Sequence, residues 1–175
     1  MKPLTDYIRS IPDFPKPGVI FRDLTPLVEN ARGFRSAIDV LKEGIKKFGS
    51  FDKIVAPEAR GFLFAAPLAL EFNVGAVLAR KPGKLPYETV GIDYELEYGV
   101  NRIEIHKDSI AQGERVLIVD DLLATGGTVD ACRQLVEKMG ASVVGAAFVV
   151  ELVDLKGRER LANLPVFAPV SFKGE

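Results

Sequence analysis

The fold is decided by the stretch Val116-Leu117-Ile118-Val119-Asp120-Asp121-Leu122-Leu123-Ala124-Thr125-Gly126-Gly127-Thr128. It opens with four consecutive apolar residues, three of them β-branched, flanked by charge on both sides. Such a run is typical of a strand that is buried on both faces, as in a parallel sheet. Two carboxylates and a loop of small residues follow, and from Val129 apolar residues recur at helical spacing as far as Gly140. The stretch therefore predicts a strand, a loop and a helix in direct succession.

The loop in this stretch has the composition of an anion-binding site. Gly126 and Gly127 let the backbone turn its N–H groups toward an anion without a Cβ in the way. Thr125 and Thr128 add hydroxyl donors, and the start of the following helix adds unpaired N–H groups and a positive dipole end. A phosphate monoester is the ligand that such a loop suits best.

The two carboxylates before the loop narrow the ligand further. Asp120 and Asp121 offer acceptors, and the vicinal hydroxyls of ribose offer donors, so the pattern favours a ribose 5-phosphate. The structural alternative is that the acids only cap the next helix and the glycines only form a turn. The order of strand, acids, glycine loop and helix favours the functional interpretation. Neither of the other common phosphate motifs, G-x-x-x-x-G-K-[ST] or G-x-G-x-x-G after a strand, is present.

Composition restricts the class of protein. The 175 residues are enough for one domain over 1–175, and 47% apolar with 27% charged residues is ordinary for a globular chain. The net charge of −1 argues against nucleic acid or an anionic membrane as partner. One cysteine, Cys132, and one histidine exclude an internal disulfide and a His/Cys metal cluster. With no signal peptide and no apolar run of membrane length, we expect a cytoplasmic protein.

Apolar periodicity along the chain predicts an α/β fold. It favours helices over 34–48 and 62–72, buried strands over 54–56, 74–79 and 143–150, and a further strand over 102–106. Residues 1–30 are proline-rich and predict a small appendage outside the main sheet, and residues 81–99 predict a long loop or a mobile hairpin. Alternating strands and helices indicate a mainly parallel central sheet with helices on both faces. Ligands of such sheets bind beyond the carboxyl ends of the strands, at a topological switch point.

Taken with five further blocks, the stretch resembles the phosphoribosyl pyrophosphate (PRPP) motif of the type I phosphoribosyltransferases, and in particular their adenine-specific members. The blocks are Asp13-Phe14-Pro15-Lys16-Pro17-Gly18-Val19-Ile20-Phe21-Arg22-Asp23, Glu58-Ala59-Arg60-Gly61-Phe62, Arg80-Lys81-Pro82-Gly83-Lys84-Leu85-Pro86, Leu96-Glu97-Tyr98-Gly99 and Asp154-Leu155-Lys156-Gly157-Arg158. The resemblance implies the type I phosphoribosyltransferase fold, with a small hood over 1–33, a core over 34–175 and a mobile loop over about 81–100. It implies conversion of adenine and PRPP to AMP and pyrophosphate, typically by a homodimer.

The resemblance also implies which residues bind PRPP. Asp120 and Asp121 would hold the ribose hydroxyls, with Asp121 the more direct contact, and Ala124, Thr125, Gly126, Gly127 and Thr128 would hold the 5-phosphate. Arg60 and Lys84 would bind the pyrophosphate, together with Mg²⁺ held through substrate oxygens and water rather than by protein ligands. From spacing alone, Arg60 could equally pair with Glu58, and the cations of the 80–84 block could be a solvated surface.

Adenine recognition is implied for the hood and for the end of the last buried strand. The main chain of Val19, Ile20, Phe21 and Arg22 would read the edge of the base, and Leu152 would pack on one of its faces. Glu97 would act on the proton of the attacking ring nitrogen. The alternatives are plain packing for the hood residues and an inert, exposed Glu97. At the level of function, the alternatives are a phosphoribosyltransferase for another base or a non-catalytic PRPP-binding regulator.

Overall fold

The structure, a computed structural model, describes residues 2–95, 100–161 and 163–174. Its strands are β1 (Arg9–Pro12), β2 (Ile20–Asp23), β3 (Lys53–Pro57), β4 (Gly75–Ala79), β5 (Thr89–Glu95), β6 (Val100–His106), β7 (Arg115–Leu123), β8 (Ser142–Leu152), β9 (Val166–Phe167) and β10 (Val170–Phe172). The helices are α1 (Thr25–Glu29), α2 (Ala31–Ile45), α3 (Gly61–Phe72), α4 (Gly127–Lys138) and α5 (Gly157–Arg160), with short 3-10 turns at Leu4–Tyr7, Lys46–Phe48 and Val153–Leu155.

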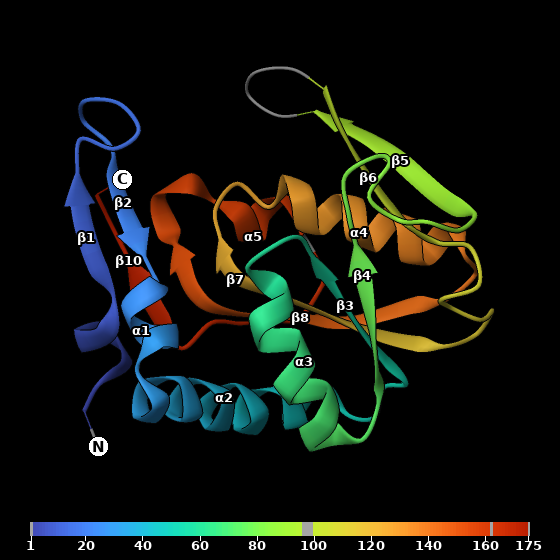
Figure 1. Cartoon of the computed structure of the whole chain (residues 1–175), viewed down its shortest axis with the longest axis horizontal. Helices are drawn as coiled ribbons and strands as arrows, with labels where there is room; N and C mark the ends of the chain where they lie inside the picture. Colours follow the sequence, from blue (N-terminus) through green and yellow to red (C-terminus); the bar gives the residue numbers. More distant parts are fainter. Residues whose placement is uncertain (1, 96–99, 162, 175) are drawn as a thin grey trace.

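A six-stranded sheet forms the centre of the molecule (Figure 1). Its strands follow the order β10-β8-β7-β3-β4, with β9 also paired to β8, and all of these pairings are parallel. Strand β7 lies inside the sheet between β3 and β8, and its four apolar residues Val116 to Val119 are fully buried. The predicted parallel sheet, and the buried strand on which that prediction rested, are thus confirmed.

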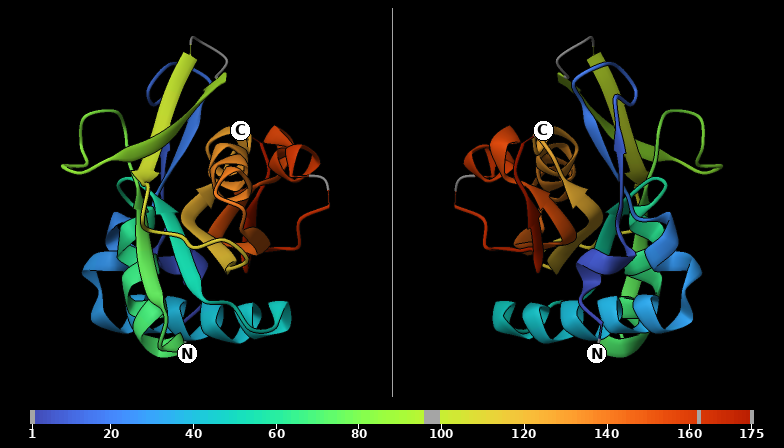
Figure 2. Two further views of the ribbon diagram at one scale, coloured as in Figure 1. Left: turned by 90° about the vertical axis from the view of Figure 1, so that its right-hand side faces the viewer. Right: turned by 90° about the vertical axis from the view of Figure 1, so that its left-hand side faces the viewer.

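Helices cover both faces of the sheet (Figure 2). Leu117 and Val119 belong to a core that includes residues of α2 and α3, whereas Val116 and Ile118 belong to a second core that includes residues of α4. Alternate residues of β7 therefore face opposite helix layers, as the pleat of a strand requires. Helix α4 carries the predicted apolar stripe, and Gly140, with φ +79°, follows its end.

Strand β4 differs from the sequence prediction of a strand buried on both faces. Val77 and Ala79 are buried, but Gly75, Ala76 and Leu78 are exposed. The physical reason is its place at the edge of the sheet: one of its faces packs on the core and the other is left uncovered. A continuous apolar run does not distinguish these two situations.

Strands β5 and β6 form an antiparallel pair, called the hairpin below, that stands apart from the central sheet. Strands β5 and β6 pair antiparallel from Thr89 with His106 to Glu95 with Val100. The hairpin is joined to the end of β4 by two backbone hydrogen bonds of 2.8 Å between Arg80 and Glu104. The sequence indicated a loop or hairpin over 81–99 and a separate strand over 102–106; the structure pairs these segments with each other.

The N-terminal segment is an appendage, as predicted. Strands β1 and β2 form their own antiparallel pair next to β10, at the left of Figure 1. Ile8, Leu24 and Leu27 are buried and attach it to the core of α2 and α3.

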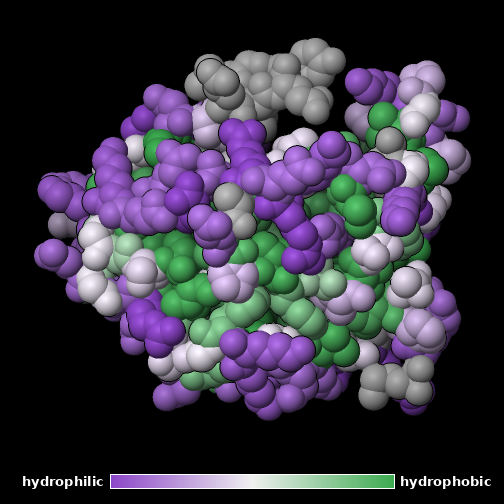
Figure 3. Space-filling view, turned by 180° about the vertical axis from the view of Figure 1, so that it is seen from behind, coloured by the Kyte–Doolittle hydropathy of each residue, from purple (hydrophilic) through white to green (hydrophobic). Residues whose placement is uncertain are grey.

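Seen from behind, hydrophobic surface crosses the middle of the molecule between hydrophilic regions (Figure 3). Among the described helices, none has the length and apolar character needed to cross a membrane.

Candidate active site

The candidate site lies where two neighbouring strands end and the chain leaves them in opposite directions. From β3 the chain runs through α3 to β4 on one side, and from β7 it runs through α4 to β8 on the other. This divergence makes the carboxyl ends of β3 and β7 the switch point of the sheet. The loop that carries Arg60 follows β3, and Asp120 to Thr128 follow or end β7. The fold thus brings together two blocks that are 60 residues apart in the sequence.

Arg60 is paired with Asp121 and not with its neighbour Glu58. The Nε of Arg60 lies 2.6 Å from Oδ2 of Asp121, but the N–H does not point at this oxygen, so the contact is an ion pair without hydrogen-bond geometry. Glu58 instead accepts a hydrogen bond of 2.8 Å from Nε of Arg80. The alternative that the sequence spacing left open, a pair between Arg60 and Glu58, is therefore wrong. Half of the Arg60 side chain remains exposed, so it is open to an anion.

The two aspartates face different parts of the site. Asp120 lines a hollow with the glycine loop, whereas Asp121 is buried against Arg60. Burial, together with the negative charge of Asp121, raises the pKa of Asp120 well above its usual range. Burial also raises the pKa of Asp121, although the guanidinium of Arg60 acts against this shift. Oδ1 of Asp120 accepts a 2.8 Å hydrogen bond from the backbone N–H of Asp121.

The loop expected to hold the 5-phosphate forms a small hollow of about 80 Å³. Its lining is continuous in sequence apart from Asp121 and consists of Asp120, Leu122, Leu123, Ala124, Thr125, Gly126, Gly127, Thr128 and Val129. Gly126 has φ +80°, a left-handed conformation that favours glycine, and immediately precedes the first residue of α4. The unpaired N–H groups at the start of α4 therefore lie at this hollow, as an anion site requires.

The hairpin contacts this loop through a residue that the sequence did not single out. The hydroxyl oxygen of Tyr94 in β5 lies 3.4 Å from Oγ1 of Thr128. Val90, Ile92 and Tyr94 alternate along β5 and pack on the core of α4. That alternation is the signal that could have placed Tyr94 on the inner side of the hairpin.

In the hood, Phe21 approaches the site. Its ring centroid lies 5.9 Å from the guanidinium carbon of Arg60, and the ring of Phe14 packs on it edge-on at 5.2 Å. Phe14, which the sequence reasoning gave no role, is half exposed. The backbone N–H of Val19 donates to the carbonyl of Lys16, and the carbonyl of Val19 accepts from the N–H of Phe14, both at 3.3 Å.

Arg22, in the same hood strand as Ile20, contacts the C-terminal strand β10. Ile20 and Arg22 lie in β2, and the guanidinium of Arg22 stacks 4.1 Å from the ring centroid of Phe172. Phe172 is the register partner of Leu152, which is buried at the end of β8. The hood strand and Leu152 are therefore connected through β10.

Of the two residues predicted on the mobile loop, Lys84 and Glu97, the structure describes only Lys84. The Lys84 side chain is exposed, while its carbonyl accepts a 3.1 Å hydrogen bond from Nη1 of Arg80, which also binds Glu58. The backbone at Lys84 is thereby connected to the loop that carries Arg60. Glu97 lies outside the described residues. Within the described ranges, no group of three or more His, Cys, Asp or Glu side chains is arranged to hold a metal ion.

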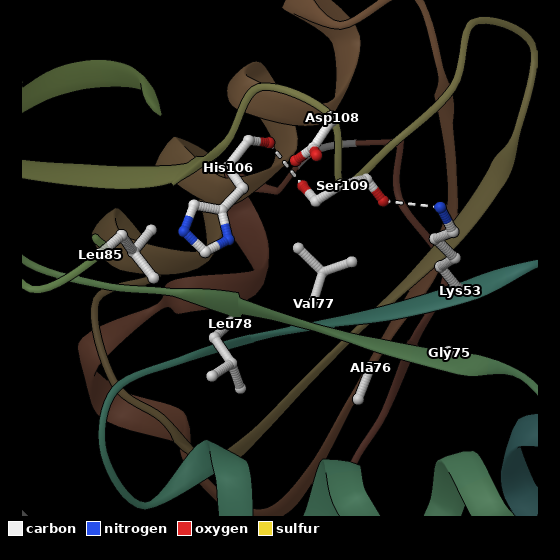
Figure 4. A pocket seen from close by; sticks show the side chains of 9 residues that line it. All are labelled: Lys53, Gly75, Ala76, Val77, Leu78, Leu85, His106, Asp108 and Ser109. Atoms are coloured by element: carbon white, nitrogen blue, oxygen red, sulfur yellow. Dashed lines mark hydrogen bonds between the residues drawn. The ribbon is translucent and has the colours of Figure 1, made fainter. Parts of the chain in front are cut away.

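A larger pocket of about 440 Å³ lies along β4, with a floor formed by Gly75 to Leu78 (Figure 4). Lys53 and His106 line it, and Nε2 of His106 is buried without a hydrogen-bond partner among the described residues. Because Lys53 and Gly75 begin β3 and β4, this pocket extends toward the amino ends of the strands. It shares no lining residue with the hollow of the glycine loop.

Comparison with known proteins identifies the family. Residues 25–164 match the model of the phosphoribosyl transferase domain. The adenine phosphoribosyltransferases of Kosmotoga olearia and Roseiflexus sp. are 53% and 52% identical over 169 residues, which cover 97% of this chain and 99% and 98% of theirs.

Solved structures agree. The adenine phosphoribosyltransferase of Thermoanaerobacter pseudethanolicus superimposes with a TM-score of 0.92 at 50% identity, covering 97% of this chain and 98% of that one. The enzyme of Saccharomyces cerevisiae, in complex with adenine and an imino-altritol bisphosphate, gives 0.89 at 42% identity, covering 94% and 95%. The chain belongs to the adenine phosphoribosyltransferases.

Proposed function

We propose that this protein transfers the 5-phosphoribosyl group of PRPP to adenine, producing AMP and pyrophosphate. The observation that carries this proposal is the meeting of three groups at one switch point: the Arg60 guanidinium, the two carboxylates and the glycine loop at the start of α4. These groups match the three polar parts of PRPP, which are the diphosphate, the ribose hydroxyls and the 5-phosphate. The close similarity to known adenine phosphoribosyltransferases supports adenine as the base.

Each part of PRPP has a proposed partner. The 5-phosphate lies in the hollow of residues 124–128, where backbone N–H groups and the hydroxyls of Thr125 and Thr128 donate to it. Asp120 and Asp121 accept hydrogen bonds from the ribose hydroxyls. Arg60, and Lys84 when its loop closes, bind the diphosphate. Closure of residues 84–100 excludes water, which would otherwise compete with adenine as nucleophile.

The reaction is a displacement at C1 of the ribose. N9 of adenine forms the new bond to C1 while the bond from C1 to the diphosphate oxygen breaks, through an oxocarbenium-like transition state. Arg60 stabilises the charge that develops on the leaving pyrophosphate. Glu97 takes up the proton of the purine ring nitrogen as that nitrogen attacks. General acid–base catalysis of this kind increases the rate by about 10²–10⁴-fold.

Mg²⁺ is the proposed cofactor, and the groups at the site fit it. The side chains beside the proposed ribose position offer carboxylate oxygens, which are the donors that this hard cation prefers. Among the described residues, Oδ2 of Asp121 has no hydrogen-bond partner besides its ion pair with Arg60. Asp120 and Asp121 would hold the ion through its bound water, while the diphosphate supplies direct ligands. When bound, Mg²⁺ neutralises charge on the diphosphate and makes it a better leaving group. Removal of the ion with a chelator should abolish turnover, and added Mg²⁺ should restore it.

Selectivity for adenine is proposed to come from the hood. Adenine presents an amino donor beside a ring acceptor, and a peptide presents the complementary pair, whereas a 6-oxopurine presents the opposite pattern. The carbonyl of Val19 could accept a second hydrogen bond from the base through its other lone pair, and its N–H would exchange the long bond to Lys16 for the base. Phe21 and Leu152 cover the faces of the ring, and Ile20 and Arg22 extend the strand that presents the main chain.

We also propose a homodimer. Three leucines on neighbouring elements are exposed although apolar: Leu63 and Leu70 of α3 by 46% and 84%, and Leu78 of β4 by 44%. An apolar face of this kind marks an interaction surface. Sedimentation equilibrium should give twice the chain mass, and Leu70→Glu should lower it toward the monomer.

Because PRPP is highly charged and does not cross a bilayer unaided, the proposed compartment is the cytoplasm, where PRPP is available.

The decisive test is product formation from PRPP and Mg²⁺ with adenine, hypoxanthine, guanine and orotate in parallel. AMP from adenine alone is the expected result. Turnover of another base would retain the PRPP site and overturn the role of the hood. Binding of PRPP without turnover of any base would overturn the proposed enzymatic activity and favour a PRPP-binding regulator.

A further inference from the structure

The short helix α5 lies directly behind the glycine loop (Figure 1). A Cβ added to Gly157, its first residue, would overlap the carbonyl oxygen of Ala124 and lie 2.9 Å from the side chain of Leu123. In the opposite direction, a Cβ on Gly126 would lie 2.7 Å from the carbonyl oxygen of Gly157. The two backbones therefore touch without side chains between them, and the position of one determines that of the other.

A bidentate ion pair holds α5 in this position. Nε and Nη2 of Arg158 donate to the two carboxylate oxygens of Glu151, each at 2.7 Å, and Nη1 donates to the carbonyl of Val166 at 3.0 Å. Glu151 is only 9% exposed, so this pair is partly shielded from water. Glu151 is also the register partner of Leu123 on β7, immediately before the loop.

The far end of α5 is connected to α4. Nε of Arg160 lies 3.9 Å from Oδ2 of Asp130, a buried residue whose carboxylate also accepts hydrogen bonds from Arg133 and Gln134. The backbone N–H of Asp130 donates to the carbonyl of Gly126. The loop connects β7 to α4, and α5 contacts it from outside these two elements. The loop is thus enclosed by β7, α4 and α5.

From these contacts we infer that Gly157 and the Glu151–Arg158 pair are positioning residues for the ribose 5-phosphate. They contact the phosphate only through the loop: Gly157 supports the backbone at Ala124 and Gly126, and the ion pair fixes Gly157. Because a hydrogen-bonding site loses much of its effect when its groups move by about 1 Å, a displaced loop binds the phosphate poorly. This inference rests on the proposed placement of the 5-phosphate in the loop.

The test is calorimetric titration of the full-length protein with ribose 5-phosphate and, separately, with pyrophosphate. Gly157→Ala and Glu151→Gln should each weaken ribose 5-phosphate by about tenfold or more, while pyrophosphate, bound by Arg60, changes by less than about twofold. In steady-state assays the effect should fall on KM for PRPP more than on KM for adenine. Arg158→Lys should also weaken ribose 5-phosphate binding, because an ammonium cannot form the bidentate pair.

Two matched controls accompany these variants. Glu159→Gln removes a carboxylate from the same short helix, where its pair with Lys156 is long and exposed, and Gly75→Ala adds a methyl group that meets no atom closer than 3.9 Å. Both should bind ribose 5-phosphate like the wild type. If Gly157→Ala does not fold, Glu151→Gln, which keeps the size of the side chain and one acceptor for Arg158, still tests the inference.

The outcomes separate this inference from the proposed function. If Thr125→Ala and Thr128→Ala leave the affinity for ribose 5-phosphate unchanged, the proposed placement fails, because in that placement both hydroxyls donate to the phosphate. If those two variants weaken binding but Gly157→Ala and Glu151→Gln do not, only the positioning role is overturned. A lowered melting temperature with unchanged affinity in folded protein would likewise reduce α5 to a purely structural element.

Discussion

Arg60 and Asp121, the residues proposed for the diphosphate and the ribose, are paired with each other across the site, with Nε and Oδ2 at 2.6 Å. Asp121 is almost completely buried, whereas half of the Arg60 side chain is exposed. The exposed part of the guanidinium is free to bind an anion while the buried carboxylate keeps the side chain in place. The ion pair therefore connects the carboxyl ends of β3 and β7 and orients Arg60 before the substrate arrives.

Arg60→Ala should separate these two roles. We expect kcat/KM for PRPP to fall by about 10²–10³-fold, the usual effect of removing one group that stabilises developing charge. We also expect the free energy of unfolding at pH 7 to fall by ~1–2 kcal/mol, since Asp121 loses its partner; the exposed half of Arg60 keeps this figure low. Steady-state kinetics and urea unfolding measure the two effects.

The double variant Arg60→Ala/Asp121→Asn provides the control. It should recover the lost stability, because no buried charge remains unpaired, but not the activity. Arg35→Ala, which breaks an exposed pair with Glu71, should change neither. Equal stability of Arg60→Ala and the wild type at pH 7 would show that the ion pair contributes nothing to the fold.

Asp120→Asn should stabilise the protein in a pH-dependent way. Burial and the charge of Asp121 raise the pKa of Asp120 in the folded state, so the folded protein holds this proton more tightly than the unfolded chain. As pH rises above about 4, the unfolded chain ionises first and the wild type loses stability. Asparagine has no such proton and keeps the acceptor for the N–H of Asp121.

Melting temperatures between pH 4 and 8 check this prediction. The variant should melt higher than the wild type at pH 7 to 8, and the difference should shrink toward pH 4, while kcat/KM for PRPP falls. Asp108→Asn, at an exposed position, should leave the melting curve unchanged. A difference between Asp120→Asn and wild type that does not vary with pH would exclude the raised pKa as its cause.

Some features of this structure could be predicted from the sequence and others could not, because the sequence signals report different physical properties. Val116 to Val119 identified an interior strand, because burial on both faces requires apolar residues at every position. The 74–79 run looked the same but lies at an edge, since periodicity reports apolar content and not the neighbours of a strand. In the site, the glycine loop was recognisable because its backbone conformation restricts residue type. The Arg60–Asp121 and Arg80–Glu58 pairs were not, because ion pairs between distant segments depend on tertiary packing.

Glu97→Gln tests the proposed acid–base role. The amide keeps the size and hydrogen-bonding capacity of the side chain but cannot take up a proton, so kcat should fall by about 10²–10⁴-fold while KM for adenine changes little. Burst-phase kinetics with adenine and PRPP should show whether the chemical step is the one that slows. Glu88→Gln, at an exposed ion pair before the hairpin, is a matched control and should retain wild-type turnover. A Glu97→Gln enzyme as fast as the wild type would remove this residue from the mechanism.

Tyr94 and Thr128 should couple the hairpin to the phosphate loop. Their hydroxyl oxygens are 3.4 Å apart, at the long end of a hydrogen bond, so Tyr94→Phe should raise KM for PRPP by less than about fivefold, which corresponds to ~1 kcal/mol. Thr128→Val should have a larger effect, because it also removes a proposed phosphate donor. In the double variant the Tyr94→Phe effect should disappear, since the partner hydroxyl is already absent. If the two effects add fully in KM for PRPP, the hairpin acts on the loop through another contact, and the Tyr94–Thr128 contact has no part in organising the site.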